Sequence, residues 1–362
     1  MTSGDPRGAP TGGGPGEIVF GVDVGGTKVL GVALRDDLVV AEARVPTPTR
    51  PGGPAGPVAT TGEDVANAIV EVVAAVAGRV AGGTGGAGRV PAEGGTPVIG
   101  VGMPGMVDRS GVLRFAPNLP AAGGTDFRRL LARRLAPTTP ATPPPVVVIE
   151  NDTNLATLAE HRLGAARGAD NVLMVTLGTG IGGGVVLGGR VLTGSSGFAA
   201  EVGHMVVDPS GPPCPCGRRG CWERLASGGA LGRLAGEAAR AGSLARVVAL
   251  AGGDPGDVRG EHVTEAARQG DEGALSVMEE LGRWVALGLA NLAALLDPSR
   301  IVVGGGLAQA GEVLLAPTRR AFAGMVEGGT ARPRIEIVEA ELGERAGAIG
   351  AALAAPGGGL PA

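Results

Sequence analysis

The chain has 362 residues with a formal net charge of -4 at pH 7. This length suits about two domains of ~150 residues, each with an apolar core of its own, and excludes a small disulfide-stapled scaffold. The 31 basic residues are scattered along the sequence, so neither a nucleic-acid-binding surface nor a polybasic membrane patch is expected.

Hydrophobic patterning predicts alternating strands and helices in the first part of the chain. Residues 1–16 are rich in Gly and Pro without an apolar segment, and we expect a disordered tail that is not a secretory signal. The predicted elements are strands at 18–24, 29–34, 38–45 and 98–103 and helices at 64–80 and 126–135. The Gly/Pro-rich stretches 81–96 and 137–145 are expected to be surface insertions, and we place a domain boundary after the second.

The remainder is predicted to be largely helical, again with interspersed strands. We expect strands at 146–149, 172–177, 182–187, 301–303 and 335–340, helices at 153–163, 271–296, 312–326 and 345–354, and a cysteine-containing loop at 204–223. No apolar run reaches the ~18 residues that a membrane span needs. We therefore expect no membrane partner.

A strand, a glycine-rich turn and a second strand occur twice, as DVGGTKVLGV at 23–32 and LGTGIGGGVVLGG at 177–189. Glycines let backbone N–H groups approach phosphate oxygens closely. Neither segment has Walker or Rossmann spacing, because the chain continues as a strand after the turn. The duplication predicts an α/β protein of two related lobes that enclose a cleft and hold a polyphosphate from both sides. Simple hairpin turns are the alternative.

The residues expected to hold a nucleotide lie in these two turns and in a third glycine cluster after strand 301–303. They are Asp23, Gly25, Gly26, Thr27, Lys28, Gly178, Thr179, Gly180, Gly182, Gly304, Gly305 and Gly306. Asp23 is suited to hold Mg²⁺ through water, because that ion prefers oxygen ligands. Lys28 is the only lysine of the chain. The third cluster suits the flat face of a base or ribose.

All three cysteines of the chain, Cys214, Cys216 and Cys221, follow His204 within 17 residues of sequence. One imidazole and three thiolates form a closed tetrahedral set typical of structural Zn²⁺, with no open position to activate water. Free cysteines in a reducing compartment are the alternative. Such a site would fix the loop that also carries Glu201 and Glu223. The other two histidines, at 161 and 262, are interpreted as ordinary helix-face residues.

Glu150-Asn151-Asp152 stands between a predicted strand and helix. Ligands of α/β proteins often bind at the carboxyl ends of strands, where Asn151 offers a donor and an acceptor and Asp152 a base. Asp152 is suited to take the proton of a sugar hydroxyl that attacks a γ-phosphate. A simple helix N-cap is the alternative for Asp152. Gly105 in GMPG and Asn118 in APNLP are candidates for the opposite wall.

The segments DVGGTK, LGTGIGGGVVLGGRVLTGSSGFAAEVGH and CPCGRRGCWE, in this order, resemble the ROK family of sugar kinases and sugar-responsive repressors. The resemblance covers residues 17 to 354 and implies a two-lobed actin/hexokinase-like, ribonuclease H-like α/β fold with an interlobe cleft and a zinc-stapled loop. We expect a small lobe at 17–145, on which a C-terminal helix at 344–355 packs, and a large lobe at 146–343 that carries the zinc loop 204–223.

The resemblance also implies an ATP-dependent hexose kinase of the cytoplasm, assembled as a homodimer or homotetramer and using Mg²⁺. The segment from Gly203 to Glu223 is especially similar to glucokinases of the family, which favours glucose phosphorylated at its 6-hydroxyl. Asp152 is the implied base, and the implied sugar contacts are Gly105, Asn118, Asn151, Asp152, Glu201, His204 and Glu223. After Asn118 the chain lacks the Gly-Trp that family glucokinases often have.

Alternatives are a kinase for another hexose or an N-acetylhexosamine, one that uses polyphosphate, or a sugar-sensing repressor. A repressor needs a helix-turn-helix module ahead of the first lobe, and only 16 Gly/Pro-rich residues precede the first predicted strand.

Overall fold

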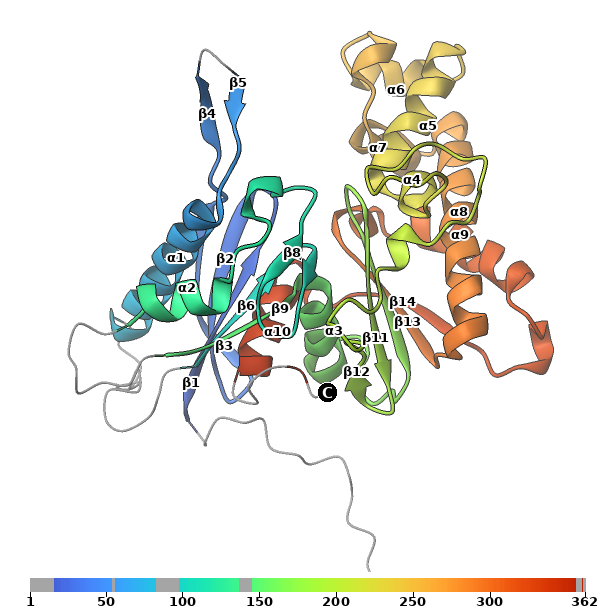
Figure 1. Cartoon of the computed structure of the whole chain (residues 1–362). Coiled ribbons are helices and arrows are strands. Elements are labelled where there is room, and N and C mark those ends of the chain that lie inside the picture. Colours follow the sequence, from blue (N-terminus) through green and yellow to red (C-terminus); the bar gives the residue numbers. More distant parts are fainter. Residues whose placement is uncertain (1–15, 54–55, 83–97, 137–144, 356–359, 361–362) are drawn as a thin grey trace, which may run out of the picture. The chain divides into compact units, whose positions relative to one another are not determined.

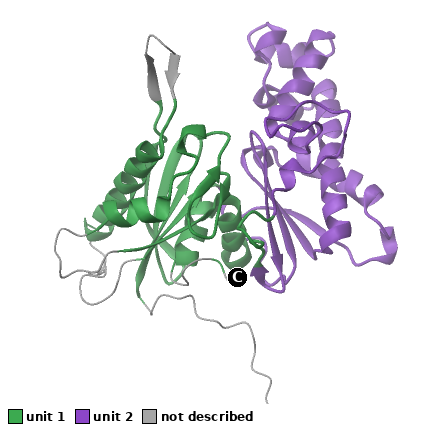
Figure 2. Cartoon of the chain, viewed as in Figure 1, with its two compact units in different colours: residues 1–163, 191–199, 344–362 green, residues 164–190, 200–343 purple. Residues whose placement is uncertain are grey.

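The computed structural model describes residues 16–53, 56–82, 98–136, 145–355 and 360 (Figure 1). The tail 1–16 and the insertions 81–96 and 137–145 lie outside these residues, apart from their edges. Two compact units form (Figure 2). Unit 1 comprises residues 1–163, 191–199 and 344–362, and unit 2 comprises residues 164–190 and 200–343.

Unit 1 is built on a five-stranded sheet in the order β3-β2-β1-β6-β9. Its strands are β1 (Ile18–Val24), β2 (Lys28–Arg35), β3 (Leu38–Pro46), β6 (Val98–Met103) and β9 (Val146–Asn151). β1, β2 and β3 pair antiparallel, whereas β6 and β9 continue from β1 in parallel. Two hairpins, β4 (Arg50–Gly53) with β5 (Gly56–Val58) and β7 (Met106–Val107) with β8 (Leu113–Phe115), were not predicted.

Helices cover both faces of this sheet (Figure 1). They are α1 (Gly62–Gly82), α2 (Phe127–Arg134), α3 (Asp152–Leu163) and α10 (Ala346–Ala354). α10 packs very closely on the sheet because glycines line its path: a Cβ at Gly21 would lie 2.0 Å from the Ala348 carbonyl oxygen, and one at Gly100 would lie 1.9 Å from that of Ala351. The helix at the end of the chain thereby completes the core of unit 1.

α1 is long and apolar enough, by length and composition alone, to cross a membrane. It is not an uninterrupted apolar run, because it mixes Ala, Val and Gly with isolated charges. Val65, Ile69, Val72 and Val76 recur at helical spacing and are buried. This stripe packs on β2 and β3, as expected for a core helix.

Unit 2 repeats the same sheet order, β12-β11-β10-β13-β14. Its strands are β10 (Val172–Leu177), β11 (Ile181–Leu187), β12 (Arg190–Val191), β13 (Arg300–Gly304) and β14 (Glu336–Glu339). β10 and β11 pair antiparallel, and β13 and β14 continue in parallel. The duplicated strand-turn-strand segments therefore occupy equivalent positions in two related α/β units, and the expected fold class is confirmed.

Helices of unit 2 pack around α8 (Glu272–Leu296), the longest helix predicted from the sequence. The others are α4 (Glu223–Ala226), α5 (Gly228–Arg240), α6 (Ala245–Leu250), α7 (Gly260–Arg268) and α9 (Glu312–Met325). Short 3-10 turns include η2 (Val202–His204), η4 (Gly306–Ala310) and η5 (Gly329–Ala331).

The division into units differs from the boundary expected after residue 145. Both β9 and α3 belong to unit 1, because β9 pairs with β6 and α3 packs against α10. The segment 191–199 also belongs to unit 1, although the strands before it belong to unit 2. The unit to which each of these segments belongs is set by its contacts with segments that are distant in the sequence.

Candidate functional site

Asn151 and Asp152 connect the end of β9 to the start of α3. The Asn151 Oδ1 accepts a hydrogen bond from the Asn154 N–H at 2.9 Å, which caps the helix, and its Nδ2 donates to the Gly105 carbonyl at 3.0 Å. Gly105 has a φ of 95°, where a Cβ would lie 2.3 Å from the Phe115 carbonyl oxygen. Asn151 therefore fixes both the helix start and the Gly105 turn, and leaves Asp152 in the first turn of α3.

Glu150 stabilises this arrangement through hydrogen bonds to Asn151 and Asn154. No role was predicted for it from the sequence. Its Oε1 accepts from the Asn151 N–H at 2.9 Å and from the Asn154 Nδ2 at 3.3 Å. Burial raises the pKa of Glu150, while these two hydrogen bonds oppose the shift. The only sequence signal for it is its place directly before Asn151 and Asp152.

Asp23 is the second-last residue of β1 and lies close to Asp152. Burial and, to a lesser extent, the charge of Asp152 raise the pKa of Asp23 to about 8, although Lys28 acts to lower it. Among the described residues, the buried Asp23 Oδ1 has no hydrogen-bond partner. A Cβ at Gly102 would lie 3.2 Å from that oxygen and 3.4 Å from the Asp152 Cα, so glycine leaves room between them. Two neighbouring carboxylates with an unpartnered oxygen suit a Mg²⁺ ion.

The turn after β1 is a tight hairpin turn. The Gly25 N–H donates to the Lys28 carbonyl at 2.9 Å, and the Thr47 Oγ1 donates to the Gly25 carbonyl at 2.7 Å. Gly26 has open space where a Cβ would stand. Lys28 forms an ion pair with Glu344, which also pairs with Arg44. The lysine expected to contact phosphate is thus held at the start of the segment that leads into α10.

Gly178 and Thr179 of the second glycine turn, at 178–180, line a cavity of about 690 Å³ within unit 2. The Gly178 N–H donates to the Gly180 carbonyl at 3.0 Å, and the Gly228 N–H donates to the Gly178 carbonyl at 2.8 Å. The turn therefore lies against the N-terminus of α5. A cavity of this size holds a nucleotide-sized molecule.

The third glycine cluster, at 304–306, packs against the residue that precedes the second glycine turn. Gly305 has a φ of 84°, and a Cβ there would lie 2.5 Å from the Leu177 carbonyl oxygen. Only glycine fits this contact. Gly306 lines the cavity together with Gly178 and Thr179, whereas Gly304 ends β13 and Gly182 pairs with Thr176 inside the sheet.

The cavity also contains residues that sequence reasoning missed. They come from α5, from α7 with the residue before it, and from η4: Gly228, Gly229, Leu231, Arg259, Gly260, Glu261, Thr264, Arg268, Leu307, Gln309 and Ala310. No motif marks them, because they meet only through the packing of three helical segments. Two arginines among them give the cavity positive charge for an anionic ligand.

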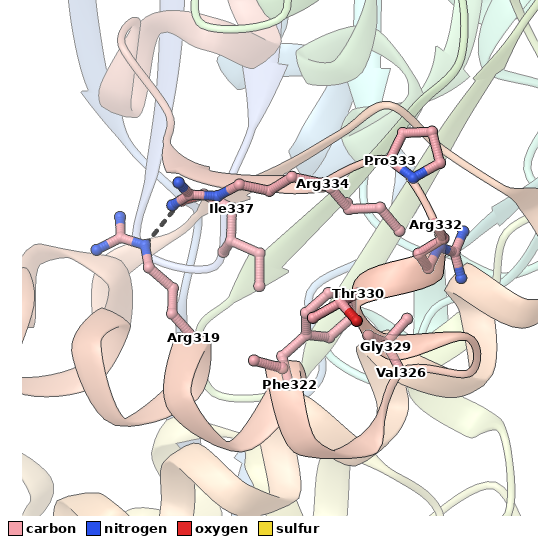
Figure 3. Close-up of a pocket in the computed structure, with 11 residues that line it drawn as sticks. Arg319, Phe322, Val326, Gly329, Thr330, Arg332, Pro333, Arg334 and Ile337 are labelled. Atoms are coloured by element: carbon pink, nitrogen blue, oxygen red, sulfur yellow. Dashed lines mark hydrogen bonds between the residues drawn. The ribbon is translucent and has the colours of Figure 1, made fainter.

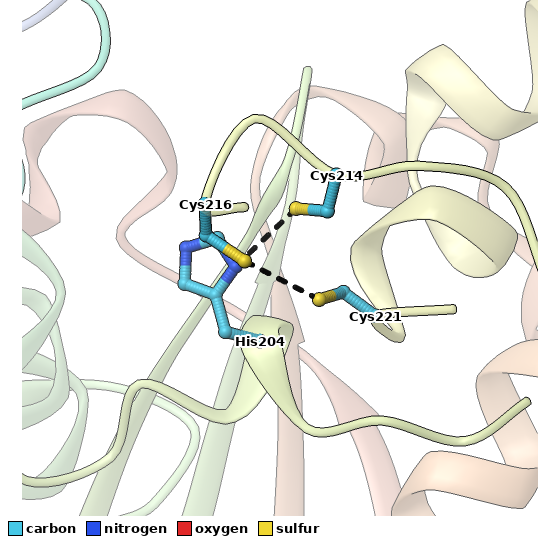
Figure 4. Close-up of side chains that lie close together, drawn as sticks. All are labelled: His204, Cys214, Cys216 and Cys221. Atoms are coloured by element: carbon cyan, nitrogen blue, oxygen red, sulfur yellow. Dashed lines mark hydrogen bonds between the residues drawn. The ribbon is translucent and has the colours of Figure 1, made fainter. Parts of the chain in front are cut away.

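The side chains of His204, Cys214, Cys216 and Cys221 converge (Figure 4), with their ligand atoms all within 4.8 Å of one another. Cys214 Sγ lies 3.7 Å from His204 Nδ1, and Cys216 Sγ lies 3.6 Å from Cys221 Sγ. Tetrahedral Zn²⁺ with Zn–S bonds of ~2.3 Å requires a sulfur–sulfur separation of ~3.8 Å. The donor set and its spacing therefore fit a structural zinc ion.

The electrostatics of this cluster favour a thiolate at Cys216. Burial acts to raise its pKa, but the backbone N–H and side chain of Arg218 stabilise the thiolate and lower the pKa to about 6. Burial raises the pKa of Cys214 and of Cys221. One thiol is thus prepared for metal binding at neutral pH.

Glu223 lies next to this cluster and to the glycine turn. Its Oε1 is 3.7 Å from His204 Nδ1, and a Cβ at Gly180 would lie 2.6 Å from its Oε2. Glu201 immediately precedes η2, where its carbonyl accepts from the His204 N–H at 3.1 Å. Unit 2 therefore places Glu223 beside the predicted phosphate turn.

Each unit brings together its own share of the predicted residues. Unit 1 groups Asp23, Gly105, Asn151 and Asp152, while Asn118 is exposed on the loop after β8. Unit 2 groups the cysteine cluster, Glu223 and the turns at 178–180 and 304–306.

Comparison with known proteins identifies the chain's relatives. The family model described as "ROK family" matches residues 19–357. The chain is 38% identical to a glucokinase of Streptomyces coelicolor, over 92% of this chain and 96% of that protein. It is 35% identical to a glucokinase of Thermotoga maritima, with the same two coverages of 92% and 96%.

A solved structure gives the same result. The ROK family glucokinase from Streptomyces griseus in complex with glucose and AMPPNP is 37% identical, with a TM-score of 0.75, and the match covers 93% of this chain and 99% of that chain. Sequence and fold agree over nearly the whole length, and the chain belongs to the ROK family.

Proposed function

We infer that this protein is an ATP-dependent sugar kinase that transfers the γ-phosphate of ATP to the 6-hydroxyl of glucose. The observation that carries this proposal is the near full-length similarity to glucokinases, one of them in complex with glucose and AMPPNP. The described site residues supply the groups that this reaction needs: a carboxylate base, a magnesium-binding carboxylate and a glycine-lined cavity for a nucleotide.

Asp152 is the general base. It takes the proton of the 6-hydroxyl as the hydroxyl oxygen bonds to the γ-phosphorus and the bond to the β-γ bridging oxygen breaks, leaving ADP. The Thr153 N–H donates to the Asp152 Oδ1 at 2.7 Å, which holds the carboxylate in one orientation. Asn151 and Gly105 position the sugar beside it, with Asn118 as a further contact.

ATP occupies the cavity of unit 2. Its phosphates meet the backbone N–H groups of the 178–180 turn, and Gly306, the member of the third glycine cluster that lines the cavity, gives the ribose and base a surface without a side chain. Arg259 and Arg268 contribute positive charge. The turn of unit 1, with Gly25, Gly26, Thr27 and Lys28, is the second phosphate contact. Asp23 would hold Mg²⁺, which neutralises charge on the phosphates when it is bound.

His204, Cys214, Cys216 and Cys221 would hold Zn²⁺ in a closed site that supplies folding energy and no catalysis. These ligands fix the segment that carries Glu201, His204 and Glu223, which contact the sugar hydroxyls. We propose a cytoplasmic enzyme, in keeping with its reduced cysteines and its use of ATP, and a homodimer or homotetramer.

Identification of the product tests the donor and the acceptor together. Purified protein is incubated with glucose and either Mg-ATP or Mg-polyphosphate, and the products are followed by ³¹P and ¹³C NMR. We expect glucose 6-phosphate and ADP in equal amounts with ATP. Phosphate on another hydroxyl, or turnover with polyphosphate alone, would contradict the proposal.

A further inference from the structure

Unit 2 contains a second cavity, formed by elements other than those of the nucleotide cavity (Figure 3). Its volume is about 540 Å³, within the range of sites for small molecules. Its walls come from the C-terminal half of α9, from η5, from the strand β14 and from the segment that joins them. The lining residues are Arg319, Phe322, Ala323, Val326, Gly329, Thr330, Arg332, Pro333, Arg334, Ile335 and Ile337.

The cavity has an apolar wall that belongs to the protein core. Phe322 is 5% exposed and Ile337 is 6% exposed, and both belong to the hydrophobic core of unit 2. Val326 and Ile335 pack against the same core. Because these side chains are fixed by the core, the cavity is preformed and offers a hydrophobic surface to a ligand.

Three arginines complete the lining. Arg319 donates from Nε to the Ile337 carbonyl at 2.9 Å and pairs through Nη1 with Glu312 at 2.8 Å. Arg332 pairs with Asp297, and its buried Nε has no hydrogen-bond partner among the described residues. In Figure 3 the side chains of Arg319 and Arg334 extend toward the Ile337 end of the cavity, whereas Arg332 lies near Pro333.

Arg334 differs from the other two arginines in its lack of an acidic partner among the described residues. Arg319 and Arg332 have acidic partners, but we find neither an ion pair nor a hydrogen bond for the exposed Arg334 within the described part of the chain. Among the residues that the structure describes, no acidic side chain lines the cavity. A guanidinium without a partner beside an apolar wall is complementary to a ligand with an anionic head and an apolar body.

We propose that this cavity binds a small apolar anion, a molecule whose hydrocarbon or aromatic body lies on Phe322 and Ile337 while its carboxylate, sulfonate or phosphate group meets Arg334. The site is separate from the kinase reaction. A second copy of the chain is the alternative occupant, and dilution of the protein distinguishes it from a small anion.

The probe is 1-anilinonaphthalene-8-sulfonate, an aromatic anion that fluoresces when it leaves water. It is titrated into the full-length protein with a saturating non-hydrolysable ATP analogue, which occupies the nucleotide cavity. We expect one site per chain. R334Q should weaken binding by ~10-fold through loss of a charge-assisted hydrogen bond. A323W should abolish binding, because Ala323 is exposed on α9 at the cavity wall and an indole there would fill the space.

Two matched variants control for indirect effects. R320Q removes the neighbouring arginine of α9, which pairs with Glu279 outside the cavity, and A323S keeps the cavity open. Both should bind the probe like the unmodified protein. The midpoint of thermal unfolding of R334Q should equal that of R320Q, and the midpoint of A323W should equal that of A323S.

Competition then separates the charge from the apolar body. Decanoate and decyl phosphate should both displace the probe, and decanol and decylamine should not. Equal probe binding in all four variants would overturn the proposal, as would displacement by decanol alone. Probe stoichiometry that rises on dilution would assign the face to contacts between copies of the chain instead, because their dissociation would uncover it.

Discussion

The indole of Trp222 lies directly against the backbone of Gly288, so close that a Cβ at position 288 would stand 2.0 Å from Trp222 Cε2. Trp222 is fully buried, and its Nε1 donates to the Trp284 carbonyl at 2.8 Å. This tryptophan stands between the zinc-ligand candidate Cys221 and the sugar-contact candidate Glu223. It therefore anchors the functional segment to the long helix α8.

Gly288→Ala should disturb this anchor. The new methyl group cannot coexist with the indole in its present position, so we expect a loss of ~2 kcal/mol in the free energy of unfolding and a higher KM for glucose. The KM for ATP should change much less. Gly78→Ala in α1 is the control: a Cβ there meets no atom within 4 Å, and alanine should stabilise that helix by ~0.5 kcal/mol. Unchanged glucose affinity in Gly288→Ala would refute the anchor.

Asp152→Asn should remove the general base while keeping the geometry. Asparagine retains an oxygen that can accept from the Thr153 N–H, so we expect the fold and glucose binding to persist. Turnover should fall by ~10²- to 10⁴-fold. Calorimetry measures glucose binding, and coupled ADP release measures turnover. Asp170→Asn, on an exposed carboxylate, should be fully active. A variant at 152 that keeps most of its turnover would show that the base is another group.

Cys216→Ser should remove one of the four converging ligands. We expect the zinc content to fall from one ion per chain to less than stoichiometric, the free energy of unfolding to drop by ~2 kcal/mol or more and the glucose affinity to fall with it. Metal analysis and urea denaturation measure these effects. Active wild-type protein that carries no zinc would contradict the assignment of a structural metal.

Asp23 should make stability depend on pH. Its folded-state pKa of about 8 lies above the ordinary value of 3.8, so between pH ~4 and 8 the folded protein retains a proton that the unfolded chain has lost. The contribution of Asp23 to the free energy of unfolding therefore falls as the pH rises from ~4 to 8, and it stays low above pH 8. Asp23→Asn has no such proton to lose.

Urea denaturation without added magnesium checks this effect. The denaturation midpoint of Asp23→Asn should exceed that of the wild type, by a margin that grows from pH 5 to pH 9. A margin that stays constant over this range would mean that Asp23 titrates at its ordinary pKa in the folded protein.

Local patterns were sufficient to predict the repeated strand-turn-strand segments. The turns at 25–28 and 178–180 lie at equivalent positions because each follows an apolar strand and contains glycines, which are local features. His204 and the three cysteines were likewise visible as a cluster in sequence, and the structure brings their side chains together.

Features that depend on distant pairing were not visible. The contact units divide after Leu163 and not after residue 145, since β9 looks like the start of a lobe until its pairing with β6 is known. The cavity that we propose for the nucleotide was not visible as a whole, because Gly228, Arg259 and Gln309 reach it from separate helical segments. Glu150 was passed over because an acidic residue before a helix has no distinctive spacing.

The central claim is that this ROK family member is a glucose kinase, and its specificity tests that claim most directly. Coupled ADP release with Mg-ATP is measured side by side for glucose, fructose, mannose, N-acetylglucosamine and N-acetylmannosamine. We predict that kcat/KM for glucose exceeds that for every other sugar by at least ~10-fold, a difference of ~1.4 kcal/mol in transition-state stabilisation. A higher kcat/KM for another sugar, or no ADP release with any of the five, would contradict it.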